Sequence, residues 1–225
     1  MLHNIAPNIW HTQHYFVVKG LRVSTRMTVV RLQGGSLWLH SPVPISSELK
    51  AEITALGEVK YVVAPSKMHH LFVVNCMVAF PQASLFGAPG LQAKRPDLQG
   101  MRELQAVAEP SWQEDLEQHF FAGMPLVNET VWFHKPSRTL IVTDLLQYYQ
   151  GDLSFGLKLY ARLTGTLNQL AVPKTVRWLV KDRAAALSSA KKILDWPFER
   201  IVVAHNVIVE ADAHTTVEKA FQSFK

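Results

Sequence analysis

Four segments of the sequence end in residues that can bind a metal ion or transfer a proton. KYVVAPSKMHH ends in His69 and His70, LIVTDLL contains Asp144, RIVVAHNVIVE contains His205, and SLWLHSP contains His40. Each of these residues follows a short apolar run that is typical of a buried β-strand. Ligands gather at the carboxyl ends of strands in α/β sheets. Imidazole nitrogen and carboxylate oxygen are donors that zinc, iron and manganese accept, so the pattern indicates a candidate metal site.

Each of these residues also has an ordinary structural explanation. His69 and His70 fit the start of a helix, with one polar contact each. Asp144 fits the N-cap of a following helix, and His205 fits a core histidine bonded to the backbone. Adjacent side chains in a helix point about 100° apart, so one of the paired histidines can bind a metal while the other packs or orients a neighbour.

Further residues near these segments are weaker candidates. Glu129 is a candidate acid or a partner for a ligand histidine, and His134 and His40 are candidate neighbours or additional ligands. Lys67 is a candidate contact for an anionic substrate group. His119 is a weak candidate for an intermediate ligand. A solvent-exposed or simply packed side chain is the alternative interpretation for each.

Composition places these candidates in an ordinary globular protein. The chain has 225 residues, of which 48% are hydrophobic and 18% charged, which fits a single domain spanning 1–225. Its only cysteine, Cys76, excludes an intramolecular disulfide and a thiolate-rich zinc site. We see no secretory signal and no apolar run near the roughly 20 residues that span a bilayer. We therefore expect a cytoplasmic protein with no membrane partner.

The charge of the chain is mildly basic, with a net charge of +5. Lysines and arginines are spread along the sequence without a basic motif interleaved with aromatic residues, so we do not expect nucleic acid as the main partner. The expected partner is a small-molecule substrate. The apolar segment 145–172 fits a lid, a pocket wall or an oligomer contact, and the last of these would suit a homodimer.

The expected elements form a mixed α/β pattern in two roughly similar halves. The first part of the chain reads as strands with turns at Lys19-Gly20 and Gly34-Gly35. The remaining elements are expected in this order: a helix at 46–57, a strand at 59–63, a helix at 69–79, a hairpin over 129–142, a helix at 175–193, a strand at 201–204 and a helix at 211–224.

With these motifs in place, the chain resembles a divergent branch of the metallo-β-lactamase superfamily, from NIAPNIWHT to AHNVIVEADAHTTVEKAF. The superfamily's His-x-His-x-Asp-His stretch aligns with residues 65–70 in an eroded form. Pro65 and Lys67 stand at its two leading histidines, His69 stands at its aspartate, and His70 keeps its final histidine. Thr143-Asp144 matches the family's (G/T)D, and Ala204-His205 matches its late Gly-His.

The resemblance implies a fold and a site. The fold is a four-layered αβ/βα sandwich in which helices flank two mixed β-sheets. The site is mononuclear, because a lysine in place of a histidine repels a second divalent ion. Its implied ligands are His69, His70, Asp144 and His205, with His70 favoured over His69. The implied cofactor is one divalent transition-metal ion, zinc or iron.

Three functions follow from these expectations. The first is a metal-dependent hydrolase of an ester, thioester, amide or phosphoester, with Asp144 as ligand and catalytic base. The second is a degenerate, non-catalytic member of the fold that acts as a binding or interaction protein without need of a metal. The third is an anion- or nucleic-acid-binding protein that uses Lys67, Lys94 and Arg95.

Overall fold

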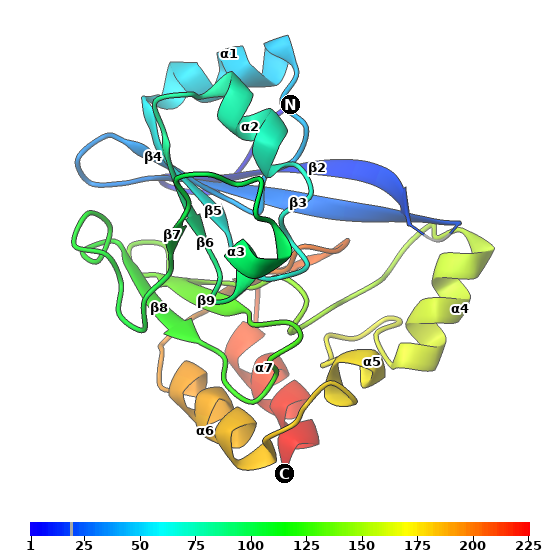
Figure 1. The fold of residues 1–225 in the computed structure, drawn as a ribbon. Helices are drawn as coiled ribbons and strands as arrows, with labels where there is room; N and C mark the ends of the chain where they lie inside the picture. The colour runs from blue at the N-terminus through cyan, green and yellow to red at the C-terminus, as the bar shows by residue number, and fades with distance from the viewer. Residues whose placement is uncertain (19) are drawn as a thin grey trace.

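Two β-sheets face each other in the computed structural model, which describes residues 1–18 and 20–225 (Figure 1). Residue 19, half of the turn predicted at Lys19-Gly20, lies outside the described residues. Helices cover the outer face of each sheet, so the molecule has the predicted αβ/βα layers. Within the described residues, no helix is both long and apolar enough to cross a membrane.

The first sheet has seven strands that follow one another in chain order. The first four pair antiparallel and the last four pair parallel, so the sheet is mixed. Thr28 pairs with His40, which confirms the hairpin predicted around Gly34-Gly35. The strands are β1 (His3–Ala6), β2 (Ile9–Val18), β3 (Leu21–Arg31), β4 (Leu37–His40), β5 (Val59–Ala64), β6 (Ser84–Gly87) and β7 (Arg102–Glu103).

The second sheet has five strands in the order β12-β11-β10-β9-β8. Only β10 and β11 pair parallel, and His134 pairs with Thr139 in the hairpin predicted around Lys135-Pro136-Ser137. The strands are β8 (Leu116–Phe120), β9 (Thr130–His134), β10 (Thr139–Ile141), β11 (Arg200–Val202) and β12 (Ile208–Val209).

Alternation of side chains along the strands separates the layers. Trp38, Val63 and Trp132 pack between the two sheets, whereas their chain neighbours Leu39 and Val62 pack outward under helices. Successive side chains of a strand point to opposite faces, so strands buried on both sides are apolar throughout. This explains the unbroken apolar runs that precede the polar strand ends.

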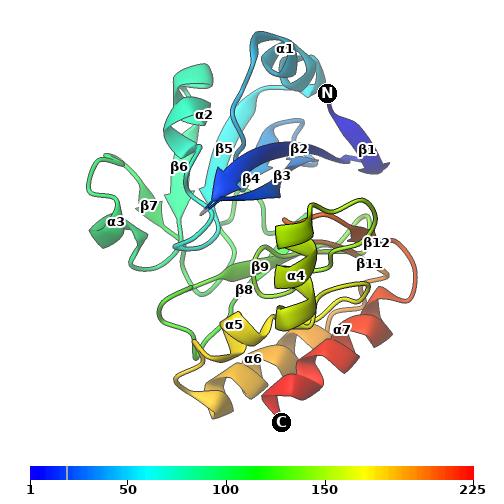
Figure 2. The same cartoon turned by 90° about the vertical axis from the view of Figure 1, so that its right-hand side faces the viewer.

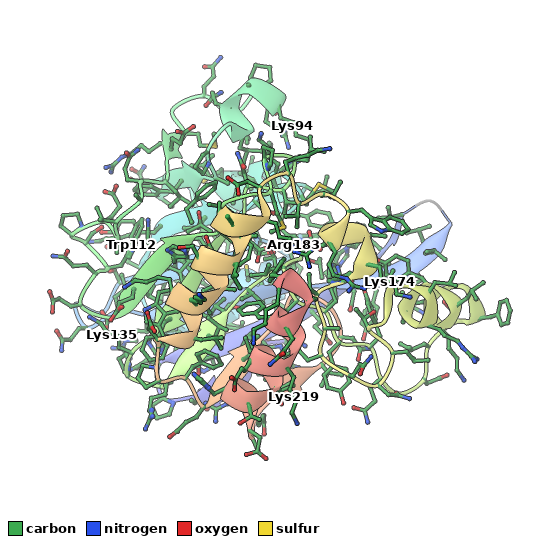
Figure 3. All side chains as sticks on the ribbon, turned by 90° about the horizontal axis from the view of Figure 1, so that it is seen from below. Lys94, Trp112, Lys135, Lys174, Arg183 and Lys219 are labelled. Atoms are coloured by element: carbon green, nitrogen blue, oxygen red, sulfur yellow. The ribbon has the colours of Figure 1, made fainter. Side chains whose placement is uncertain are left out.

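The helices divide between the two sheets (Figures 1 and 2). The first sheet is covered by α1 (Ser47–Leu56) and α2 (Val73–Ala79), with the short α3 (Leu91–Lys94) nearby. The second is covered by α6 (Arg183–Leu194), α7 (Ala213–Phe221) and a terminal 3-10 turn at Gln222–Phe224. Figure 3 views this layer from below, with Lys219 of α7 at its surface. At the side of the sandwich lie α4 (Phe155–Thr164) and α5 (Lys174–Arg177).

Two predicted helices differ from the structure. The helix predicted from His69 begins instead at Val73, because the Ser66 hydroxyl accepts the N–H groups of Met68 and His69 and holds a turn. The helix predicted over 175–193 is two helices, because the Gly123 carbonyl accepts the Lys181 N–H at 2.8 Å and draws the chain out of helical geometry. By contrast, α1 begins at the predicted cap, with Ser46 accepting the Leu49 N–H.

Candidate metal centre

Three of the predicted ligands converge where strands of both sheets end. His69 follows β5, Asp144 follows β10 and His205 follows β11. One donor atom from each lies within 4.8 Å of the others. The His69 Nε2 atom is 3.3 Å from Asp144 Oδ2, and the His205 Nε2 atom is 3.0 Å from Asp144 Oδ1. Asp144 therefore sits between the two imidazoles. We call these three residues the His–Asp–His cluster.

His205 is oriented by the first sheet. Its Nδ1 donates to the carbonyl of Ser24 at 2.5 Å, which leaves Nε2 to face Asp144. The Ser24 hydroxyl also accepts the Asn206 N–H at 3.1 Å. The buried guanidinium of Arg26 donates to the carbonyls of Val203 and Asn206. Residues of β3 thus fix both the ring and the loop that carries it.

His69 is oriented by the turn after β4. Its Nδ1 lies 2.8 Å from the hydroxyl of Ser41, and its backbone N–H bonds to the Ser66 hydroxyl. Ser41 has a φ of 54°, a left-handed backbone conformation that is uncommon for serine. With Nδ1 held there, Nε2 points at Asp144.

Asp144 is held through its backbone by Glu129. The carboxylate of Glu129 accepts the N–H groups of Thr143 at 2.5 Å, Asp144 at 2.9 Å and Leu145 at 2.9 Å. Glu129 is fully buried, so these bonds are shielded from water. The Asp144 side chain receives a further hydrogen bond from the Gln147 amide at 3.1 Å. Glu129 contacts backbone rather than a ligand histidine, unlike one of the roles predicted for it.

The electrostatics of the cluster favour an ionised Asp144. Burial by itself raises the pKa of Asp144, but the charge and hydrogen bonds of His69 and His205 hold that pKa well below its usual range. Burial lowers the pKa of His205, and the bond to Asp144 outweighs it, so the pKa of His205 is raised. Burial and then the charge of Asp144 raise the pKa of Glu129 to about 7.

The donor set fits one transition-metal ion. Donors placed about 2.0–2.2 Å from a tetrahedral zinc are roughly 3.3 Å apart. Each His–Asp distance in the cluster is close to this value, although the two imidazoles face different oxygens of Asp144. Ligand histidines typically donate their other ring nitrogen to a carbonyl, carboxylate or water. His205 does so to Ser24, and the second nitrogen of His69 is bonded to Ser41. Three protein donors leave one position for water or substrate, as in catalytic zinc sites.

His70 does not join the cluster, although the resemblance favoured it over His69. Its Nδ1 lies 2.9 Å from a guanidinium nitrogen of Arg95. Burial, with the cations of Lys94 and Arg95, lowers the pKa of His70 to about 4. The turn after β5 points the two adjacent histidines at different partners, and it is His69 that faces Asp144.

The other predicted residues lie around the cluster or away from it. The ring of His40 stacks on Trp38 between the sheets rather than in the cluster, and its buried Nε2 has no partner among the described residues. His134 ends β9, at the opposite end of that strand from Glu129, and bonds to Ser137. Neither therefore belongs to the His–Asp–His cluster.

Of the cations predicted as anion contacts, Lys94 lines the cleft beside the cluster and Lys67 does not. The ammonium group of Lys67 donates to the Pro125 carbonyl at 3.0 Å.

Ser24, Ser41 and Arg26 are site residues that the sequence did not reveal. Ser41 stands directly after the strand-end histidine, which is a signal that could have drawn attention to it. Ser24 and Arg26 lie inside a regular strand, β3, and nothing in their spacing points to His205. Their role depends on the packing of one sheet against the other, which a local pattern does not contain.

A family model described as "Domain of unknown function (DUF4336)" matches residues 7–154. No curated protein matches the chain.

Several solved metallo-β-lactamases share the fold. The DIM-1 enzyme exposed to ceftazidime is 10% identical with a TM-score of 0.69, over 100% of this chain and 97% of that one. The enzyme from Pontibacter korlensis is 11% identical with a TM-score of 0.68, over 100% and 98%. The FIM-1 enzyme from Pseudomonas aeruginosa in its mono-zinc form is 10% identical with a TM-score of 0.65, over 99% and 94%.

At these identities the likeness shows the fold, and it confirms the fold that the sequence predicted. The chain therefore belongs to the DUF4336 family and has the metallo-β-lactamase fold.

Proposed function

We propose that the chain is a metal-dependent hydrolase that holds one divalent transition-metal ion, zinc or iron, with His69, Asp144 and His205. The observation that carries this proposal is the convergence of three donor atoms, one from each residue, within 4.8 Å. The imidazoles turn Nε2 to Asp144 and are anchored through Nδ1, as ligand histidines are. When bound, the ion would polarise the scissile group and lower the pKa of a water molecule.

Residues of the chain itself supply the other roles at the site. The low pKa of Asp144 keeps its carboxylate ionised and makes it a weak proton acceptor, so we assign it the role of metal ligand rather than that of base. Glu129 does not line the cleft, so its contribution is to hold the Asp144 backbone. His69 and His205 are fixed in orientation by Ser41 and Ser24, which limits the rearrangement needed for binding.

Metal content tests the proposal directly. We expect elemental analysis of protein purified without chelator to give about one zinc or iron per chain. Asp144→Ala and His205→Ala should lose most of it. His214→Ala is a matched control, because His214 bonds to the Leu194 carbonyl outside the cluster. His70→Ala should also keep the metal. Wild-type protein with far less than one ion per chain would overturn the proposal.

A non-catalytic binding protein is the second candidate. Lys67 stands where the resemblance places a ligand histidine, and its ammonium group is engaged by the Pro125 carbonyl. A member of the fold that has given up one metal position can also have given up hydrolysis. Metal-loaded protein that binds small molecules, yet hydrolyses no ester, thioester, amide or phosphoester, would favour this candidate.

A further inference from the structure

A cleft of about 640 Å³ opens directly onto the His–Asp–His cluster. All three cluster residues line it, so a substrate of the cluster must occupy this space. The volume lies in the range of small-molecule sites in proteins. The lining of the cleft therefore carries information about the substrate.

Most of the lining away from the cluster is apolar. Residues of β2 and β3 near their connection form one wall, and the segment between β5 and α2 forms the other. Val18 is 41% exposed, Met68 52% and Leu71 55%, so several of these side chains are in contact with water. An apolar ligand would remove them from water at a gain proportional to the area covered. The main apolar lining residues are Phe16, Val18, Val23, Met68, Leu71 and Phe72.

Described residues on both strands of the hairpin are held by neighbouring segments. The ring of Phe16 meets that of Phe72 edge-on at 5.5 Å, and His14 meets Phe72 at 5.2 Å. On the other side, Gly156 of α4 lies against Leu21 so closely that a Cβ would be 2.7 Å from its side chain. In Figure 1, α4 stands beside this end of the hairpin. The apolar wall is preformed, so a ligand spends little free energy on ordering it.

The charges of the lining favour an uncharged substrate over a phosphorylated one. Within the described part of the chain, Asp144 and Lys94 are, apart from the histidines, the charged side chains that line the cleft. The Lys94 ammonium group already donates to the Lys67 carbonyl at 2.6 Å. Phosphate groups are usually bound by several cations or by bidentate arginine. A single engaged lysine and a long apolar wall suit a neutral ester better than a phosphoester.

We propose that the substrate is a carboxylic ester with an apolar acyl chain, whose carbonyl lies at the cluster and whose chain lies along the hairpin wall. This inference rests on the proposed function, since it places the scissile bond at the His–Asp–His cluster. Hydrolysis breaks the bond between the acyl carbon and the ester oxygen. The oxygen of water joins the acyl carbon, and a proton passes to the departing alcohol.

Binding of the acid product tests the acyl site without requiring turnover. We expect calorimetric titration with butyrate, octanoate and dodecanoate to give affinities that rise about three- to fourfold per added methylene until the wall is filled. The same order should hold for chelator-treated protein, because the wall does not include the metal ligands. Equal affinities for the three acids would overturn the inference.

Matched variants locate the chain on the hairpin wall. Val18→Asn and Leu71→Asn should weaken octanoate binding about 5- to 10-fold. Val78→Asn should leave it unchanged, because Val78 is 75% exposed on α2 and does not line the cleft. All three positions are exposed, so the variants should fold. Equal effects at Val18 and Val78 would show that the acid binds elsewhere and would overturn the inference.

Turnover separates this inference from the function on which it rests. For metal-loaded protein, kcat/KM should be higher for para-nitrophenyl octanoate than for the acetate, and Val18→Asn should reduce that preference. Faster hydrolysis of para-nitrophenyl phosphate than of either ester would overturn the ester assignment while the hydrolase proposal stands. Chain-length-dependent binding without metal or hydrolysis would overturn the hydrolase proposal and, with it, the assignment of an ester substrate.

Discussion

At the scale of single residues, the site depends on groups that do not contact the candidate metal position. Glu129 is fully buried and its carboxylate accepts three consecutive backbone N–H groups around Asp144. Above its pKa of about 7 Glu129 is ionised, and its hydrogen bonds are then charge-assisted and about twice as strong as neutral ones. Glu129 thus positions Asp144 without touching the space that a substrate can enter.

Replacement of this carboxylate should reduce metal affinity as well as stability. Glu129→Gln turns an amide NH2 group toward backbone donors, so we expect a loss of about 2–4 kcal/mol in the free energy of unfolding. Metal affinity should fall roughly 10- to 100-fold, as for other residues that support ligands. Chemical denaturation of metal-free protein and competition with a chromogenic chelator measure the two effects separately.

Asp115→Asn provides the matched control for this variant. Asp115 is also a buried carboxylate that accepts a backbone N–H, from Gln33, but it lies by the end of β9 that carries His134. It should lose stability without losing metal affinity. A Glu129→Gln protein that binds metal as tightly as the wild type would show that Glu129 has only a structural role.

At the scale of elements, the first sheet controls the ligand loop of the second. Arg26 of β3 is 3% exposed and donates to carbonyls on both sides of His205. Burial lowers the pKa of Arg26 to about 10, so its guanidinium remains charged at neutral pH. It forms no ion pair with a carboxylate within the described part of the chain. The backbone carbonyls are therefore its main partners, and it ties the loop to β3.

Removal of this guanidinium should loosen the loop. We expect Arg26→Met to speed hydrogen exchange of the amides in 203–207 and to weaken metal binding about tenfold or more. Arg31→Met, on the exposed end of the same strand, is the matched control and should change neither. Unaltered exchange in 203–207 for Arg26→Met would show that other contacts fix the loop.

Local sequence signals account for the elements that were predicted well. Ser46 and Gly57 bound α1, and Gly34-Gly35 turns β3 into β4, because caps and turns are set by the residues at those positions. The predicted start of α2 was wrong because the Ser66 side chain competes with helical hydrogen bonding. The break before α6 depends on the Gly123 carbonyl, which lies far away in sequence, so no local pattern could indicate it.

The candidate site likewise combines features that local sequence predicts with features that depend on distant segments. Strand-end positions indicated His69, Asp144 and His205, since parallel strands bring their carboxyl ends to one edge. The choice between His69 and His70 could not be made from the sequence. It depends on which way the turn after β5 points each ring, and that turn is fixed by contacts with Ser41 and Arg95 from other segments.

At the scale of the whole molecule, buried histidines link the fold to pH. Burial lowers the pKa of most histidines with a resolved shift: His11, His14, His40, His70, His119 and His134. Only His205 shifts upward among them. In the unfolded chain such groups take up protons near pH 6.5, while the native state resists until lower pH. Stability should therefore fall as the pH decreases through this window, and His205 opposes that trend.

His134 isolates one contribution, because it is fully buried and its pKa is lowered from 6.5 to about 4. Stability from a neutral buried histidine is complete above pH 6.5 and is lost as the pH falls toward 4. Between pH 8 and pH 5 the loss from this group is about 2 kcal/mol. We expect His134→Gln to lose about 2 kcal/mol less of its free energy of unfolding between pH 8 and pH 5 than the wild type does. Urea unfolding with chelator present measures this loss. At pH 8 the difference in the free energy of unfolding between the two proteins gives the packing cost of the substitution. Subtracting that difference from the one at pH 5 leaves the contribution of the proton. Equal losses in the two proteins would mean that His134 gains its proton in the folded state as readily as in the unfolded chain, and the acid sensitivity would then have to arise from the other buried histidines.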